Sequence, residues 1–256
     1  SATLGEPAVD REVDHDQAIA APGMAHHLPG LPPSEQTNSY LAEVRLSPSA
    51  PRRPVDRLLR LLDVVGALLG ILVAAPILAV AAVAILATSR GPVFFSQDRV
   101  GRDGRSFRCF KLRTMRSDAE SQLVNLLDRP EYVDQWQRAR KLDDDPRVTR
   151  VGRILRATDL DELPQFWNVL RGEMSLVGPR PVPEDEAEWY GPDLAAVLSV
   201  RPGMTGMWQV GGRHQVSYEQ RIALDVRYVA TRGVWINTRL LARTVALIVS
   251  GRNGAS

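Results

Sequence analysis

Two adjacent carboxylates, Asp161 and Glu162, form the part of this chain best suited to chemistry. Arg156 precedes them by five residues, and a Gly-Pro-Arg-Pro turn containing Arg180 follows them. Carboxylates act as nucleophiles, as general acids and bases, and as ligands of hard cations. Arginine makes charge-assisted, bidentate contacts with phosphate. This combination of residue types predicts phosphate chemistry.

The roles of the acidic pair can be compared by chemistry. Glycoside cleavage needs two carboxyl groups several Å apart across a sugar, which adjacent residues do not provide. A nucleophile fits better, because aspartate can form an acyl-phosphate and split one transfer into two steps. In this hypothesis Asp161 attacks phosphorus, Glu162 helps to bind Mg²⁺, and Arg156 and Arg180 hold phosphate. The bland alternative is a solvated helix turn, which is the commoner setting of an Asp-Glu pair.

Two further segments carry candidate ligands. The loop RPGMTG, residues 201–206, places Arg201 and Thr205 beside glycines that let backbone N–H groups approach phosphate oxygens. An ordinary turn also explains that loop. Three aspartates at residues 143–145 resemble a cation site, but a solvated turn before Pro146 is the favoured interpretation.

Composition limits the class of protein. The 256 residues suffice for one domain with appendages, and a single cysteine, Cys109, excludes an internal disulfide framework. Residues 1–50 hold seven acidic and two basic residues, whereas the remainder holds 23 acidic and 30 basic residues, which favours an anionic partner. Nucleic acid is not expected, because no aromatic stacking pattern or helix-turn-helix accompanies the arginines. Residues 1–54, rich in Ala, Pro and acids at their start, are predicted to be a disordered tail.

A long apolar segment follows this tail. Residues 64–89 contain no charge and as one helix would rise about 39 Å, enough to span a hydrocarbon core of roughly 30 Å. Pro76 near its middle predicts a break, which would leave arms of about 20 Å, too short to cross. Arginines flank both ends, as expected for a segment that enters and leaves by one face. We therefore predict a re-entrant helix–break–helix over residues 55–90, with Asp63 paired to a neighbouring arginine; a single spanning helix is the alternative.

The remaining residues, 91–256, are predicted to form the catalytic domain. Strands near 92–95 and 106–111 around a glycine-containing turn predict a β-hairpin, and residues 117–141 predict a polar helix interrupted by Pro130. Thr158 is expected to cap a helix that has Asp161 and Glu162 in its first turn. Residues 217–230 and 235–250 predict two helices, the second suited to a membrane interface or to a core-facing position.

Six motifs in order then give the chain a family resemblance. They are QDRVG at 97–101, FKLRTM at 110–115, DPRVT at 145–149, LDELPQ at 160–165, MSLVGPRP at 174–181 and RPGMTG at 201–206. The chain resembles the bacterial sugar transferases, which are monotopic polyprenyl-phosphate phosphoglycosyltransferases, from about Arg57 to its C-terminus. The expected fold is accordingly α/β, predominantly helical with a small β-hairpin, with a re-entrant membrane helix and interfacial amphipathic helices.

The resemblance also implies roles for individual residues. Asp161 resembles the nucleophile that attacks the sugar-bearing phosphorus of a UDP-sugar and releases UMP, with Glu162 as its partner and Mg²⁺ as cofactor. Polyprenyl phosphate then attacks the covalent intermediate. The residues that resemble substrate-binding or phosphate-binding positions, and the helix-breaking proline, are Arg156, Arg180, Lys111, Arg113, Arg201, Thr205 and Pro76.

The resemblance extends to substrate, partners and location. The segment from Gly212 to Glu219 is similar to the branch that transfers hexose-1-phosphate, which implies UDP-glucose or UDP-galactose. Expected partners are a UDP-sugar, undecaprenyl-type polyprenyl phosphate and membrane lipids at the cytoplasmic face of the inner membrane, with a homodimer as an option. The chain departs from the family pattern at Arg105, Ala75 and Asp159. Two other hypotheses are a membrane-tethered scaffold without activity and a metal-dependent nucleotide-sugar hydrolase.

Overall fold

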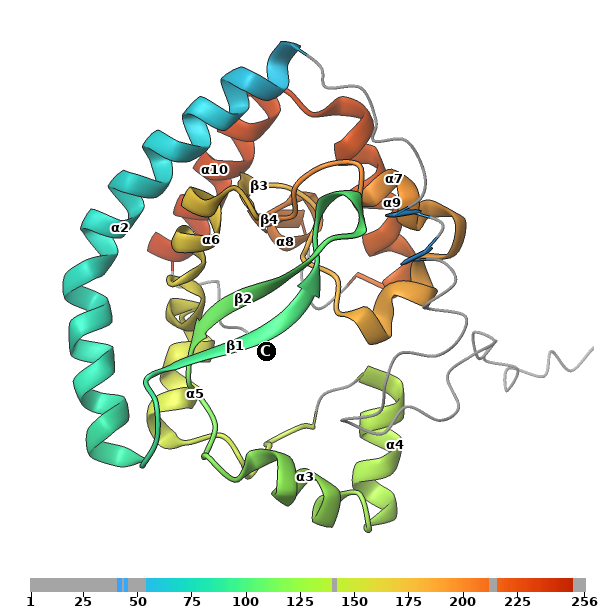
Figure 1. Cartoon of the computed structure of the whole chain (residues 1–256). Coiled ribbons are helices and arrows are strands. Elements are labelled where there is room, and N and C mark those ends of the chain that lie inside the picture. The colour runs from blue at the N-terminus through green and yellow to red at the C-terminus, as the bar shows by residue number, and fades with distance from the viewer. Residues whose placement is uncertain (1–40, 43, 46–53, 140–141, 212–215, 251–256) are drawn as a thin grey trace, which may run out of the picture.

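The computed structural model describes residues 41–42, 44–45, 54–139, 142–211 and 216–250 (Figure 1). Its helices greatly outnumber its strands, so the predicted helical class with a small hairpin is confirmed. The α-helices are α2 (Pro54–Thr88), α3 (Ala119–Leu126), α4 (Pro130–Ala139), α5 (Arg150–Ala157), α6 (Gln165–Arg171), α7 (Leu194–Val197), α8 (Met207–Gly211), α9 (Tyr218–Thr231) and α10 (Val234–Val249). The strands are β1 (Phe94–Val100), β2 (Ser106–Leu112), β3 (Ser175–Val177) and β4 (Gly203–Thr205), and the 3₁₀ segments are η1 (Arg102–Gly104), η2 (Leu160–Glu162) and η3 (Glu184–Asp193).

Helix α2 runs without interruption through Pro76, so the predicted break into two helical arms is wrong. A proline removes one backbone hydrogen bond, but a helix can bend around it instead of ending. Figure 1 shows α2 as an arc that is convex away from the rest of the molecule. Its most apolar 18-residue window has a mean hydropathy of 2.8, and only 17% of that window is buried. The helix is therefore long and apolar enough to lie in a membrane, and most of its apolar surface is exposed and able to contact lipid.

One stripe of α2 packs on the domain. Its buried residues recur at spacings of four and seven, as one face of a helix requires: Leu59, Asp63, Ala67, Ala74, Ala81 and Ile85. Gly66 and Gly70 on this side let Leu176 and Phe166 approach, because a Cβ at either glycine would lie 2.5 Å from those side chains. The small residues of the apolar segment thus allow close packing against α6 and β3.

Polar contacts fix the start of α2. The Asp63 carboxylate accepts hydrogen bonds from Ser175 Oγ and Leu176 N, both at 2.9 Å. Arg60 instead donates to the backbone oxygens of Val169 and Leu170 at 2.6 and 2.9 Å. The Asp63 carboxylate is therefore bound by N–H and O–H donors of β3. Burial raises the pKa of Asp63, and the positive charges of Arg60 and Arg201 oppose that rise, so arginines lie beside Asp63 as predicted.

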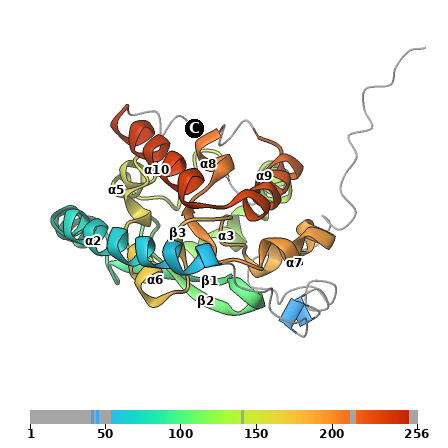
Figure 2. The same ribbon diagram turned by 90° about the horizontal axis from the view of Figure 1, so that it is seen from above.

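The predicted hairpin is confirmed. Strands β1 and β2 pair antiparallel from Phe94 opposite Leu112 to Val100 opposite Ser106. Asp103 and Gly104 in the turn adopt φ values of 60° and 70°, the left-handed region that Gly and Asp tolerate best. Figures 1 and 2 show the hairpin beside α6 and at a distance from α9.

A second, parallel pair joins the two glycine motifs. Ser175 and Val177 of β3 lie opposite Gly203 and Thr205 of β4. The Gly178 N–H donates to Thr205 O at 2.9 Å. A Cβ at Gly203 would lie 2.0 Å from the Gly178 nitrogen, so only glycine fits between these backbones. The motifs MSLVGPRP and RPGMTG are thus one packed unit, in which Gly178 and Gly203 allow the two backbones to lie in contact.

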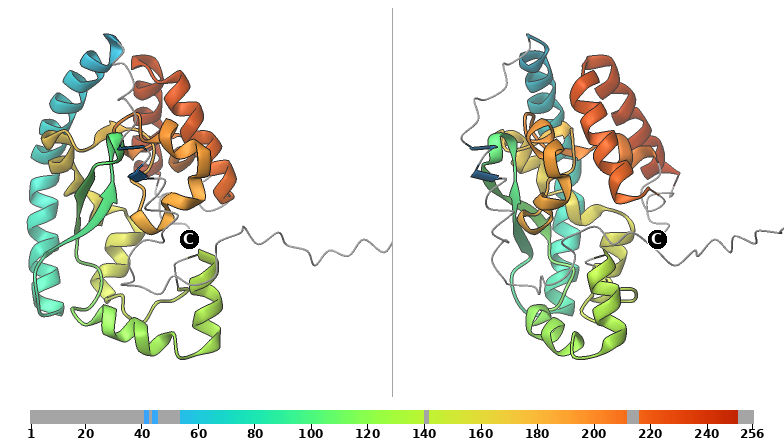
Figure 3. Two further views of the ribbon diagram at one scale, coloured as in Figure 1. Left: turned by 45° about the vertical axis from the view of Figure 1, so that its right-hand side comes forward. Right: turned by 90° about the vertical axis from the view of Figure 1, so that its right-hand side faces the viewer.

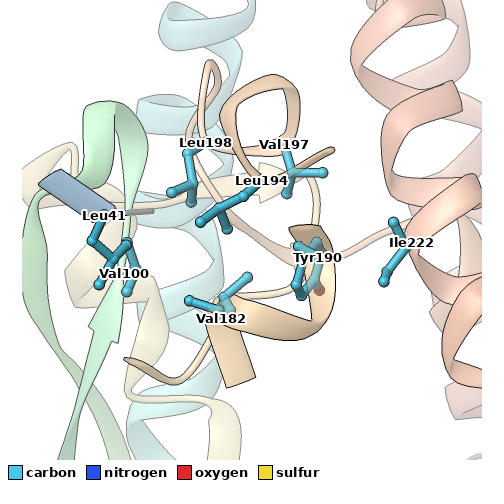
Figure 4. Close-up of a cluster of buried hydrophobic side chains, with 9 residues drawn as sticks. Leu41, Val100, Val182, Tyr190, Leu194, Val197, Leu198 and Ile222 are labelled. Atoms are coloured by element: carbon cyan, nitrogen blue, oxygen red, sulfur yellow. The ribbon is translucent and has the colours of Figure 1, made fainter. Parts of the chain in front are cut away.

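A hydrophobic cluster packs against the end of the hairpin where Val100 lies. It joins the hairpin end to η3, α7 and α9 through Val100, Val182, Tyr190, Leu194 and Ile222 (Figure 4). Leu41 is buried in the same cluster, and residues 41–42 and 44–45 are helical, so the tail predicted for 1–54 is too long at these positions. The rest of that predicted tail, 1–40, 43 and 46–53, lies outside the described residues.

The remaining helices follow the sequence predictions. Pro130 begins α4 after α3 has ended, and α9 and α10 form a helical pair. Figure 3 shows α3 and α4 at the end of the molecule opposite α9 and α10. Several large apolar side chains of α10 are exposed, including Trp235 and Val249. This leaves α10 with a surface suited to an interface, while Leu240 packs into the core.

Candidate active site

Asp161 and Glu162 lie on η2, a single 3₁₀ turn between α5 and α6. Thr149 caps the N-terminus of α5 by accepting from Gly152 N, and Asp159 turns the chain with a φ of 55°. The prediction that Thr158 caps a new helix is wrong. Thr158 follows the end of α5 and donates from Oγ1 to Ile154 O at 2.8 Å. Asp159, with its left-handed backbone, lies between Thr158 and η2, so Thr158 is not at the position that caps η2.

The two carboxylates have different surroundings. Lys111 Nζ donates to Glu162 Oε1 at 2.6 Å, across from β2 to η2. Burial raises the pKa of Glu162, but Lys111 and Arg180 outweigh this and leave the pKa below its usual value. Asp161 is 7% exposed. Burial raises the pKa of Asp161 to about 6, Lys111 and Arg156 oppose that rise, and Glu162 adds to it. Glu162 is thus kept ionised, while Asp161 is an aspartate of raised basicity that still ionises at neutral pH.

Arg156 is held against the same pair by the FKLRTM motif. Its Nε donates to Thr114 Oγ1 at 2.9 Å. Burial lowers the pKa of Arg156, and the Asp161 carboxylate raises it again, so the two side chains are electrostatic neighbours. Gly152 makes this packing possible, since a Cβ there would lie 1.9 Å from Thr114 O. The motif DPRVT, which precedes Gly152, therefore serves to seat α5 on the strand that carries Lys111.

Arg180 approaches the pair from the Gly-Pro-Arg-Pro turn. Its guanidinium lies 5.8 Å from the ring centroid of Trp208 and is close enough to Glu162 to lower the pKa of that carboxyl. The structure thus brings together five residues that the sequence singled out: Lys111, Arg156, Asp161, Glu162 and Arg180. Of these only Asp161 is buried, Lys111 and Glu162 are half-buried, and Arg156 and Arg180 are exposed. The three cations form a positive, solvent-accessible surround for the two carboxylates, which suits a substrate with several phosphate charges.

Three predicted ligands lie elsewhere. Arg113 donates to Arg90 O at 2.7 Å and to Ser89 O and Oγ at 2.9 Å, so it caps the end of α2. Arg201 donates to Gly172 O at 2.7 Å and lines a cavity of about 100 Å³ with Asp63, away from the acidic pair. Thr205 shares a hydrogen bond of 2.8 Å with Thr244 of α10.

Some residues of the site were missed from the sequence. Asn168 is fully buried, accepts from Phe110 N at 3.0 Å and donates to Arg108 O at 2.6 Å, which fixes β2 against α6. Arg99, inside the motif QDRVG, is 8% exposed and lies near Arg180 and Glu162. Period-two spacing along β1 places Arg99 on the same side as Gln97, but only the hairpin register shows that Lys111 shares that side.

The acidic pair has the donors that Mg²⁺ prefers. Mg²⁺ is usually bound by one or two carboxylates together with substrate phosphates and water, so Asp161 and Glu162 suffice as protein ligands. Among the described residues, no group of three or more His, Cys, Asp or Glu side chains could hold a metal ion without a substrate. The aspartates at 143–145 belong to a turn in which Asp143 and Asp144 are exposed, as the favoured interpretation predicted. Asp145 differs, because its side chain is buried and pairs with Arg147 at 2.7 Å.

A family of known proteins matches most of this chain. The model of the family described as "Bacterial sugar transferase" matches residues 55–251. This chain belongs to that family. The matched range begins with α2 and includes all six sequence motifs, so the resemblance inferred from the motifs is confirmed.

Three relatives illustrate the membership. The chain is 41% identical over 250 residues to "UDP-glucose:undecaprenyl-phosphate glucose-1-phosphate transferase" of Caulobacter vibrioides, covering 94% of this chain and 87% of that protein. It is 40% identical over 194 residues to "Exopolysaccharide production protein ExoY" of Rhizobium meliloti, covering 75% and 86%. It is 42% identical over 213 residues to "UDP-galactose-lipid carrier transferase" of Erwinia amylovora, covering 83% of this chain but 44% of that protein. The chain thus spans less than half of the last of these relatives and most of the other two.

Proposed function

We propose that this family member transfers a sugar-1-phosphate from a UDP-sugar to polyprenyl phosphate, of the undecaprenyl type, and releases UMP. The observation that carries the proposal is a buried Asp161 that borders Glu162, Lys111 and Arg156, in a chain with one long exposed apolar helix. The names of two of these relatives support the substrate classes, and that of the third supports a role in exopolysaccharide production. UDP-glucose and UDP-galactose are the first donors to test, since relatives are named for each.

The reaction proceeds in two displacements. A carboxylate oxygen of Asp161 attacks the phosphorus that bears the sugar, the bond to the nucleotide phosphate breaks, and UMP leaves with the electron pair. An oxygen of polyprenyl phosphate then attacks the same phosphorus and displaces Asp161. The products are UMP and a polyprenyl diphosphate sugar, and the carboxylate is regenerated.

The remaining side chains stabilise charge in this scheme. Lys111 holds Glu162 ionised and adds positive charge beside the reacting phosphorus, while Arg156 and Arg180 orient phosphate oxygens. Mg²⁺ held by Asp161 and Glu162 would neutralise diphosphate charge. The raised pKa of Asp161 makes it a stronger base, and hence a stronger nucleophile, than an ordinary aspartate.

Helix α2 supplies the location. We propose that it enters and leaves the cytoplasmic face of the inner membrane as a bent helix, and that the exposed apolar side of α10 lies in the interface. The arc of α2 and its charged flanks support this path (Figure 1). Such a monotopic arrangement would bring the lipid acceptor to the acidic pair without a soluble carrier.

The deciding experiment follows UMP release from UDP-glucose and UDP-galactose with Mg²⁺, with and without polyprenyl phosphate. Asp161→Asn should lose at least ~100-fold in lipid-dependent turnover, the scale of a main catalytic group. Asp159→Asn is the matched control, because asparagine tolerates its left-handed backbone, and it should stay within about threefold of the parent. A sugar-phosphate adduct on the Asp161 peptide, formed without lipid, would show the covalent step directly.

Other outcomes would select the other hypotheses. Lipid-independent UMP release without an adduct would indicate a hydrolase. Absence of UMP release with every UDP-sugar would indicate a scaffold. Lipid-linked product formed at the parental rate by Asp161→Asn would refute the nucleophile.

A further inference from the structure

Arg99 carries a buried charge that makes no ion pair within the described part of the chain. Its side chain donates to Gln97 Oε1 at 2.7 Å and to Pro181 O at 3.3 Å, and both acceptors are uncharged. Among the described residues, no carboxylate lies within ion-pair distance of its guanidinium. Burying a charge is costly unless an opposite charge accompanies it. The unbalanced guanidinium therefore indicates an anion that binds at this place.

A second arginine adds to the imbalance. Burial lowers the pKa of Arg99, and the nearby positive charge of Arg180 lowers it further. The Glu186 carboxyl acts in the opposite direction, but burial and Arg180 outweigh it. The hydrogen bond from Arg99 to Pro181 O ties β1 to the residue that follows Arg180. Two guanidiniums held close together repel one another, and a shared anion would turn that repulsion into attraction.

The hairpin register places this pair beside the acidic residues. In an antiparallel pair, alternate residues share a face, so Gln97 and Arg99 of β1 lie on the same side as Cys109 and Lys111 of β2. Cys109 is 3% exposed; burial raises the pKa of its thiol, and the positive charges of Lys111 and Arg99 oppose that rise. Lys111 contacts Glu162, while Arg99 lies further along the same face, with Cys109 between the two registers. Lys111 and Arg99 therefore place two positive charges along one face of the hairpin, with Lys111 at Glu162 and Arg99 further along that face.

We propose that Arg99 and Arg180 together form a phosphate-binding subsite adjacent to the Asp161–Glu162 pair. The inference rests on the proposed function in one respect, namely that the phosphate it holds is the nucleotide phosphate that leaves as UMP. When the bond from the sugar-bearing phosphorus to the bridging oxygen breaks, negative charge grows on that leaving phosphate. Two guanidiniums aimed at it would stabilise this charge. The phosphate of the lipid acceptor has the same chemistry and is the other source that the test must distinguish.

The test compares Arg99→Met and Arg99→Lys with a matched control, Arg108→Met. Arg108 lies on the same hairpin, on the opposite face, and is exposed. Titration calorimetry of the full chain in nanodiscs would measure binding of inorganic pyrophosphate and of UMP. Arg99→Met should weaken binding of both by about 10-fold or more, Arg99→Lys should recover part of it, and Arg108→Met should bind within about twofold of the parent.

Thermal melting without any anion gives a second readout. Removing an unbalanced buried charge should leave the melting temperature of Arg99→Met equal to or above that of the parent, whereas loss of a purely structural arginine would lower it. A variant Arg99→Met that binds both pyrophosphate and UMP like the parent overturns the proposal. A lower melting temperature with unchanged anion affinity overturns it as well.

Exchange of labelled UMP into the UDP-sugar, without lipid, identifies the phosphate. Reduced exchange in Arg99→Met assigns the subsite to the nucleotide. If Arg99→Met loses pyrophosphate binding but exchanges UMP normally and has a raised KM for polyprenyl phosphate, the subsite binds the phosphate of the lipid. If the parent lacks turnover but its pyrophosphate affinity depends on Arg99, the subsite stands and the proposed reaction fails.

Discussion

The amine of Lys111 lies 2.6 Å from one carboxylate oxygen of Glu162, and this contact makes two adjacent acids unequal. Glu162 is stabilised as an anion, whereas the pKa of Asp161 is raised to about 6, chiefly by burial and further by the negative charge of Glu162. Neighbouring carboxylates in one turn can therefore serve different roles, one as a permanent charge and the other as the group that reacts.

The first prediction concerns the pH profile. Asp161, the proposed nucleophile, must be ionised to react, and its pKa is raised, so activity should be present above about pH 6 and lost as the pH falls through about 6. The measurement is kcat/KM for the UDP-sugar between about pH 3.5 and about pH 8, a range that covers the expected limb and that of an unperturbed aspartate. An acidic limb near about pH 4, typical of an unperturbed aspartate, would contradict the role given to burial.

Lys111→Met should move that limb. Lys111 lowers the pKa of Asp161, so its removal should shift the acidic limb to higher pH and reduce kcat by at least ~10-fold. Glu162→Gln removes a like charge and should shift the limb in the opposite direction. Shifts of the same sign in both variants would show that the contact does not control Asp161.

A third prediction concerns Asp225, a fully buried residue of α9. Neither of its carboxyl oxygens has a hydrogen-bond partner among the described residues, although Arg180 N–H and the Trp208 indole lie close enough to lower its pKa. Burial dominates and raises the pKa to about 8. The folded state therefore keeps a proton that the unfolded chain releases, and the parent loses stability as the pH rises from about 4 to about 8.

Asp225→Asn removes that titration. Its melting temperature, relative to the parent, should be higher at about pH 7.5 than at about pH 5 by roughly 3 °C or more. Asp193→Asn, an exposed position, is the control and should show no such dependence. A variant Asp225→Asn that is less stable than the parent only at the higher pH would mean that the carboxylate is ionised and paired.

The fourth prediction concerns the paired glycines. Gly203→Ala would place a Cβ 2.0 Å from Gly178 N, between two backbones that cannot easily move, and should lower the free energy of unfolding by about 3 kcal/mol or more. Gly211→Ala meets nothing within 4 Å and should change it by less than about 1 kcal/mol. Denaturant unfolding in detergent measures both. Equal effects would remove the packing explanation of the two motifs.

The last prediction concerns the path of α2. Cysteines introduced by Ser49→Cys and by Ser256→Cys, each in a Cys109→Ala background, should both react with a membrane-impermeant reagent from the cytoplasmic side only. The reason is that charged residues flank α2 at both ends and that the helix curves as an arc. Labelling from opposite sides would establish a spanning helix instead.

The sequence predicted the hairpin, the separation of α3 and α4, and the α9–α10 pair, because glycine, proline and apolar spacing act locally. It also singled out Asp161 and the four charged residues around it. It failed where tertiary contacts decide. Pro76 continues a helix because the chain bends, and Arg113 caps α2 because β2 ends beside Ser89.

Other features of the site depend on long-range register. Arg201 belongs to a motif, yet its hydrogen bond to Gly172 O holds the side chain at a cavity away from the acidic pair. Asn168 connects α6 to β2 across 60 residues of chain, and no local pattern distinguishes it from an ordinary helical asparagine. Such residues are identified only when the strands and helices are placed together.

The hydrogen bonds from Arg113 to the backbone oxygens of Ser89 and Arg90 attach the end of α2 to the segment that follows β2. A single residue, Leu112, separates Arg113 from Lys111, so one short segment contacts both the end of the apolar helix and the Glu162 carboxylate. The depth at which that helix rests in lipid would thereby set the height of the acidic pair above the bilayer. Sugar nucleotide from the water side and isoprenoid phosphate from the lipid side could then meet at a level fixed by the protein's own backbone.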